Sequence, residues 1–241
     1  MTRAMLFTLL LLGSASVQAH GLWVAQRAGA LAVVYGEGAE EEAYDPARVT
    51  GIRAWKADGE PAGVRSAAEP QRMLIHAPEA AQIAIDFDAG EWTQSHQGKW
   101  MPGGRSAALP DARQTWRLMR FATVLLASPD APARPHGMPL EIQPLADPLL
   151  LKKGQLLPVR VLQRGKPLAG AKVIADFVND DLAAPSITDQ NGIAHVALGS
   201  NGLNVIQTAH AEAYTGTCTT DRTAYSATLS FTLPRPMEQA Q

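Results

Sequence analysis

The stretch LLPVRVLQRGKPL at residues 156–168 decides the fold class. Seven mostly aliphatic residues predict a strand, and the Gln-Arg-Gly-Lys-Pro that follows predicts a turn. Further short strands are expected downstream at 171–178, 193–198, 203–209 and 225–233, with turns at 188–192 and 200–202. Short strands at this spacing predict an antiparallel β-sandwich over residues 146–235, of immunoglobulin- or transthyretin-like type.

The preceding half is also expected to be β-rich. Apolar runs between turn signals predict strands at 22–25, 31–35, 49–55, 73–76 and 82–87. Residues 111–126 have apolar side chains at near-helical spacing and are either a helix or a strand entered from a loop. Residues 91–109, rich in Gly, Gln, Ser and Trp, predict a long loop. The sequence therefore predicts an all-β protein with two β-sandwich-like domains, at 20–145 and 146–235, and a short tail at 236–241.

The first 19 residues predict an export signal. A positive charge precedes an apolar run at 4–12, and small residues lead to Ala19. The run is shorter than the ~20 residues of a membrane span, so we expect a periplasmic protein that does not itself span a membrane. Cleavage after Ala19 makes His20 the first residue. Cleavage after Val17 would instead make His20 the third residue, but valine suits the cleavage point poorly. The alternative to an export signal is that residues 1–19 form a buried helix of the fold.

Composition narrows the function further. There are 21 Lys+Arg against 23 Asp+Glu, a net charge of −2, so the basic excess typical of nucleic-acid binding is absent. The single cysteine, Cys218, excludes an internal disulfide, and stability must come from packing.

Processing would give His20 unusual chemistry. A free α-amino group beside the imidazole can chelate one ion, and its pKa of about 7.7–8.0 allows deprotonation near neutral pH. Such nitrogen ligands suit Ni, Co, Cu and Zn, with Cu(II) the tightest. The alternative is that a histidine at this position is accidental.

Two further histidines are candidate metal ligands. His210 lies at a strand end, and strand alternation puts Glu212 on the same face, where it would bind the ion or orient the imidazole. His96 lies among aromatic residues in the predicted loop. The alternatives are that His210 is a solvated residue at a strand end and that His96 is an ordinary surface residue.

Other polar residues are expected to be structural. His195 alternates with Ile193 and Ala197, which predicts a hydrogen-bonded core histidine. Glu37 and the acidic run at 40–42 predict a solvated loop. The sequence lacks Gly-x-Ser-x-Gly, His-Glu-x-x-His, a phosphate-binding glycine loop and Cys-x-x-Cys, so we expect a protein without enzymatic activity.

Several motifs together resemble one family. They are Ala19-His20-Gly21-Leu22-Trp23-Val24, Gly36-Glu37-Gly38 with Asp45-Pro46-Ala47-Arg48, residues 139–148 (PLEIQPLADP), residues 165–171 (GKPLAGA), Thr188-Asp189-x-x-Gly192, and the stretch from Gly202-Leu203 to His210. The chain thereby resembles the family known as domain of unknown function 4198, whose members are described as periplasmic components of nickel or cobalt uptake. The resemblance implies Ni or Co as the ion, roles for His20 and His210, and an uptake component of the inner or outer membrane as partner.

The sequence thus predicts a periplasmic metal-binding accessory protein that holds a divalent transition metal through His20, with His210 and His96 completing the site. Nickel or cobalt follows from the resemblance, and copper or zinc also fits the ligands. Two alternatives stay open: a non-catalytic interaction module without metal, and a copper-binding oxidoreductase with an N-terminal histidine site.

Overall fold

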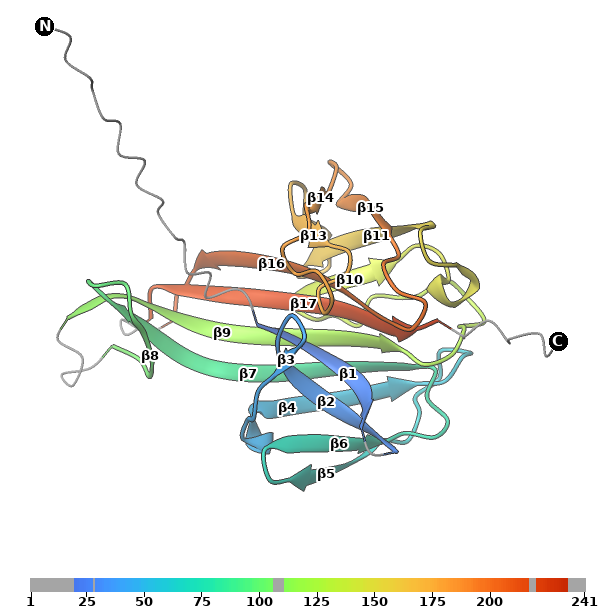
Figure 1. Cartoon of the computed structure of the whole chain (residues 1–241), viewed down its shortest axis with the longest axis horizontal. Helices are drawn as coiled ribbons and strands as arrows, with labels where there is room; N and C mark the ends of the chain where they lie inside the picture. The colour runs from blue at the N-terminus through green and yellow to red at the C-terminus, as the bar shows by residue number, and fades with distance from the viewer. Residues whose placement is uncertain (1–19, 28, 106–110, 217–219, 234–241) are drawn as a thin grey trace, which may run out of the picture.

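The computed structural model is built almost entirely of β-strands (Figure 1). It describes residues 20–27, 29–105, 111–216 and 220–233. Within these ranges the helical segments are two single 3₁₀ turns, η1 (Pro46–Arg48) and η2 (Pro148–Leu150). The prediction of an all-β fold is confirmed. The predicted signal at 1–19 and the tail at 236–241 lie outside the described residues.

The strands form three sheets. The five-stranded sheet contains β1 (Gly21–Arg27), β2 (Ala30–Glu37), β3 (Glu40–Glu41), β5 (Arg65–Glu69) and β6 (Arg72–His76), in the order β1-β2-β6-β5 with β3 on β2. The eight-stranded sheet contains β4 (Val49–Trp55), β7 (Gln82–Ser95), β8 (Trp100–Pro102), β9 (Ala112–Leu125), β13 (Lys172–Ile174), β14 (Ser186–Ile187), β16 (Leu203–Ala213) and β17 (Arg222–Thr232), in the order β14-β13-β16-β17-β9-β7-β4 with β8 on β7. The four-stranded sheet contains β10 (Leu140–Pro144), β11 (Leu156–Gln163), β12 (Lys166–Pro167) and β15 (Ile193–Ala197), in the order β10-β11-β12 with β15 on β11.

The eight-stranded sheet is the middle layer of the molecule. Because side chains alternate across a strand, β9 sends Leu118 and Val124 into a core shared with the five-stranded sheet. Phe121 and Leu125 enter a core on the opposite face, shared with the four-stranded sheet. Both faces of β9 are therefore buried.

Two strand pairs join the two halves of the chain. β9 and β17 are parallel neighbours, in register from Trp116↔Arg222 to Leu125↔Phe231, and β10 pairs antiparallel with β11. The other strand pairs among the described residues are antiparallel. Strands from the predicted 20–145 and 146–235 segments therefore share both the eight-stranded and the four-stranded sheet. The division into two domains remains a prediction.

Between residues 91 and 126 the structure resolves one ambiguity and corrects one prediction. Residues 111–126 were predicted to be either a helix or a strand, and they form the strand β9. The predicted loop at 91–109 is wrong for its first part, because β7 continues to Ser95 and pairs with β8 after a short turn. Polar pairs such as Thr93 and Thr115 hold this extension together, and they carry no hydrophobic alternation for sequence analysis to detect. Residues 106–110 lie outside the described part.

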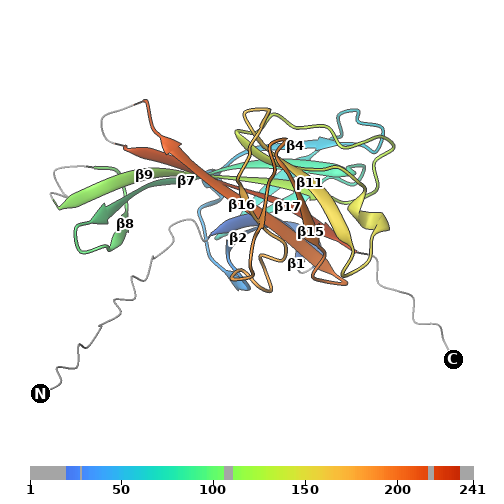
Figure 2. The ribbon, with the colours of Figure 1, turned by 90° about the horizontal axis from the view of Figure 1, so that it is seen from above.

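The extension gives the molecule an arm. In Figure 2 the outer ends of β7, β8, β9, β16 and β17 project together beyond the three-layer body. The described part of the chain contains no helix with the length and apolar character needed to cross a membrane.

Candidate functional site

A cavity of about 760 Å³ opens where the five-stranded sheet meets β7 and β9. This volume falls within the range of ~300–1,000 Å³ found for small-molecule sites. The apolar lining residues are Tyr35, Ala43, Tyr44, Phe87, Ala89, Trp92, Trp100 and Leu118. The polar lining residues are His20, Glu37, Glu42, Asp45 and Arg48.

The aromatic walls are fixed by mutual packing. Tyr35 stacks on Phe87 with ring centroids 5.1 Å apart, and Tyr44 meets Phe87 edge-on at 5.3 Å. The Tyr44 hydroxyl donates to the Val33 carbonyl and accepts from the Met73 N–H, both at 2.9 Å. Burial raises the pKa of Tyr44 to about 12, so it stays neutral. These contacts fix the positions of the aromatic rings that form the cavity wall.

His20 lies at the rim with both ring nitrogens facing carboxylates. Its Nε2 is 2.7 Å from Glu42 Oε1, and its Nδ1 is 3.9 Å from Glu37 Oε2. The ring also stacks on Tyr35, with centroids 5.3 Å apart and planes 23° apart. A carboxylate accepts hydrogen bonds only, so a neutral His20 with its proton on Nε2 donates to Glu42 and keeps the lone pair on Nδ1.

Strand register explains how the two carboxylates reach His20. Gly21 in β1 pairs with Gly36 in β2, which brings His20 beside Glu37. A Cβ at Gly36 would clash with the Glu40 carbonyl, so only glycine lets β3 approach β2 closely enough for Glu42 to follow. The acidic run predicted as a solvated loop thus belongs in part to this site. Its contact with His20 depends on cross-strand pairing, which is not visible in the linear sequence.

Two arginines flank the aromatic walls. Arg48, in η1, donates from Nη1 to the Asp88 carbonyl at 3.3 Å and forms no ion pair within the described ranges. Arg120 is 1% exposed and donates from Nη1 to the Met119 carbonyl at 3.2 Å. Burial raises the pKa of Tyr35, and the positive charge of Arg120 opposes that rise.

His210 lines a neighbouring cavity and not the His20 cavity. It borders a second cavity of about 580 Å³, which Glu37 also lines. Glu212, predicted on the same face, accepts hydrogen bonds at 2.9 Å from Tyr225 and Arg164, and Arg164 lowers the pKa of the Glu212 carboxyl. The contacts of Glu212 are thus with an arginine and a tyrosine. His210 is absent from the lining of the His20 cavity.

His96 is exposed in the turn between β7 and β8, with its backbone N–H bonded to the Asp111 carbonyl at 3.2 Å. It does not line the His20 cavity either.

His195 is exposed, so the prediction of a core histidine is wrong: Ala194 and Val196 form the buried face of β15. Over the described residues no three His, Cys, Asp or Glu side chains form a preassembled metal-binding group, and Cys218 lies outside those residues.

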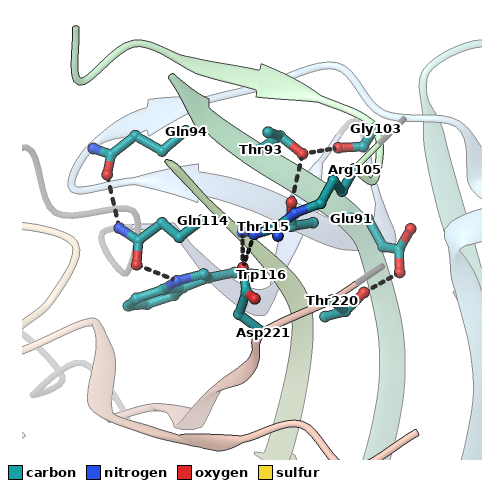
Figure 3. Close-up of polar contacts among 10 residues, drawn as sticks. All are labelled: Glu91, Thr93, Gln94, Gly103, Arg105, Gln114, Thr115, Trp116, Thr220 and Asp221. Carbon is teal, nitrogen blue, oxygen red and sulfur yellow. Dashed lines mark hydrogen bonds and ion pairs between the residues drawn. The ribbon is translucent and has the colours of Figure 1, made fainter. Parts of the chain in front are cut away.

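Polar contacts in the arm link β7, the segment after β8, β9 and the residues just before β17 (Figure 3). The Thr93 hydroxyl bonds to Thr115 and to the Gly103 carbonyl, which ties the β8 segment to β7 and β9. Asp221 accepts from the Thr115 N–H at 2.7 Å and from Arg105 at 2.8 Å. The remaining bonds drawn link Gln94 to Gln114, Gln114 to Trp116, and Thr220 to Glu91. This network holds β8 in place, and with it Trp100, which closes one side of the cavity.

The fold and the cavity define an all-β protein with an aromatic-lined cavity and a histidine–carboxylate rim. The sequence profile of Domain of unknown function (DUF4198) matches residues 17–212, and the chain belongs to this family. No curated protein matches it.

Proposed function

We propose that the mature protein is a periplasmic, non-enzymatic metal-binding accessory protein that holds a divalent transition metal at His20. Family resemblance favours nickel or cobalt and a membrane uptake component as the acceptor of the ion. The observation that carries the proposal is the position of the His20 ring between Glu42 and Glu37.

The ring orientation suits chelation. When Glu42 accepts the Nε2–H bond, Nδ1 is the nitrogen with a free lone pair, and a carboxylate partner of this kind strengthens a metal-ligating histidine. Cleavage after Ala19 would turn the His20 amide nitrogen into an amine. The amine and Nδ1 then close a six-membered ring around one ion. Glu37 Oε2, 3.9 Å from Nδ1, is on the side where that ion would sit and supplies a third ligand.

This arrangement needs no second histidine. In this proposal His210 and His96 do not share the ion with His20. The amine, Nδ1 and Glu37 form a set of three, which leaves positions open for water or another ligand and allows the ion to be passed on.

Calorimetric titration with Ni, Co, Cu and Zn tests the proposal, using protein whose first residue is shown to be His20 by mass spectrometry. We expect tight one-to-one binding. Glu42→Ala should weaken it about 10–100-fold, as expected for loss of a partner that orients a ligand. His20→Ala should weaken it more.

His195→Ala is the matched control, because His195 is an exposed histidine that does not line the cavity. It should bind as the wild type does. Unchanged affinity in His20→Ala would exclude the site, and failure of every ion to bind would favour the interaction module. A strong copper preference with turnover in the presence of a reductant would favour the oxidoreductase.

A further inference from the structure

The His20 cavity is much larger than a metal ion requires. An ion with six waters occupies about 180 Å³ at ~30 Å³ per water. That is less than a quarter of the cavity of about 760 Å³. The remaining volume has the size of a small organic molecule.

The extra volume lies against aromatic side chains. Tyr35, Tyr44, Trp92 and Trp100 line it, and the Trp92 indole N–H is already bonded to the Ala89 carbonyl at 3.1 Å. These rings therefore offer apolar faces. Hydrated ions gain nothing from such faces, whereas an organic ligand buries apolar surface against them.

The cavity also contains groups suited to an acid. Arg48 lines it, forms no ion pair in the described part of the chain, and uses one Nη1 bond to the Asp88 carbonyl. A guanidinium can bind a carboxylate through two parallel hydrogen bonds. The Tyr35 hydroxyl makes no hydrogen bond to another described residue and is a second donor. The carboxylates Glu37 and Glu42 contact His20, and the third lining carboxylate, Asp45, accepts the Ala47 N–H at 3.0 Å.

We propose that this cavity binds the ion as a complex with a small carboxylate-bearing organic chelator. His20 and Glu37 hold the metal, the aromatic walls cover the body of the chelator, and Arg48 binds its carboxylate. This inference rests on the proposed function and names the form in which the ion arrives.

The test compares nickel alone, pyridine-2,4-dicarboxylate alone, and their one-to-one complex as calorimetric titrants of the mature protein. The ring nitrogen and the 2-carboxylate of this chelator hold the nickel, and its 4-carboxylate stays free for Arg48. A parallel series uses citrate, which carries carboxylates without an aromatic ring. We expect the pyridine-2,4-dicarboxylate complex to bind at least tenfold more tightly than nickel alone. If the citrate complex gains as much affinity as the aromatic chelator complex, the gain comes from Arg48 alone. If the citrate complex gains less, the aromatic walls contribute the difference. Both outcomes support a carboxylate-bearing chelator.

Three variants locate the effect. The gain is the ratio of the affinity for the complex to the affinity for nickel alone, both measured on the same variant. Arg48→Met should remove this gain, and Arg48→Lys should keep part of it. Arg65→Gln, which removes one positive charge from the exposed strand β5, is the matched control and should keep the full gain. Equal melting temperatures establish that each variant is folded.

Equal affinities for nickel alone and for both complexes would overturn the chelator proposal while leaving the His20 metal site intact. Retention of the full gain in Arg48→Met would overturn it as well. Failure of nickel to bind in any form would overturn the proposed function and this inference together.

Discussion

Replacement of His136 by phenylalanine should remove a large part of the acid sensitivity of this protein. The His136 ring stacks on Trp55 with centroids 4.2 Å apart and planes 19° apart. Its carbonyl accepts a hydrogen bond from Arg53 Nη1 at 2.9 Å. Burial, together with the positive charge of Arg53, lowers the pKa of His136 to about 4 from 6.5.

The sign of the effect follows from proton binding. Between pH 6.5 and about 4 the unfolded chain has a protonated histidine at this position, whereas the folded chain keeps it neutral. The unfolded state then binds more protons, so the free energy of unfolding falls as pH falls through this window. A pKa lower by about 2.5, at ~1.4 kcal/mol per unit, corresponds to about 3.5 kcal/mol in full. About 3 kcal/mol of this is lost by pH 4, where the folded histidine is half protonated.

A neighbouring carboxyl acts in the opposite direction. Glu141 is 2% exposed, and its oxygens accept from the N–H groups of His136 and Gly137. Burial raises the pKa of Glu141, so its protonation at low pH favours the folded state. The comparison with His136→Phe cancels this contribution, because the variant keeps Glu141 and the aromatic stack on Trp55.

Urea unfolding at pH 7, 6, 5 and 4 measures the difference. The wild type should lose about 3 kcal/mol more than His136→Phe between pH 7 and 4, about 1 M in urea midpoint at an m-value of roughly 3 kcal/mol/M. The reasoning is refuted if the two proteins lose stability in parallel, or if the His136 ring titrates near pH 6.5 by NMR.

Three other substitutions test the core, the hairpin and the surface. Phe87→Ala should lower the free energy of unfolding by about 3–5 kcal/mol, because Phe87 is 0% exposed and supports the cavity walls; a loss below 1 kcal/mol in urea unfolding would contradict this packing. Gly36→Ala should push the Glu40 backbone away and separate Glu42 from His20, so nickel affinity measured by calorimetry should fall about tenfold or more; unchanged affinity would show that this hairpin does not set the site. Leu182→Ser should change the melting transition little, within about 0.5 kcal/mol, since Leu182 is 90% exposed; a larger loss would reveal a contact at that position.

Sequence patterns predicted the β-strand content well where hydrophobic alternation was strong. The strand at residues 156–162 corresponds to β11, and the strand expected at 203–209 is the first part of β16. Prediction failed where strands are polar or where both faces are buried. Thr93 and Gln94 look like loop residues, yet they pair with β9. In β9 itself apolar residues occur on both faces, which imitates helical spacing.

The sequence by itself determined local properties: short strands, the turns between them and the family to which the chain belongs. Only the tertiary structure decided which strands are neighbours. β9 and β17 are about 100 residues apart in sequence, and the face that each strand buries depends on the sheet it meets, as the exposed His195 shows. His20 acquires Glu37 and Glu42 as partners through cross-strand register. The physical reason is that strand conformation follows from adjacent residues, whereas strand pairing and burial depend on contacts between segments distant in the chain.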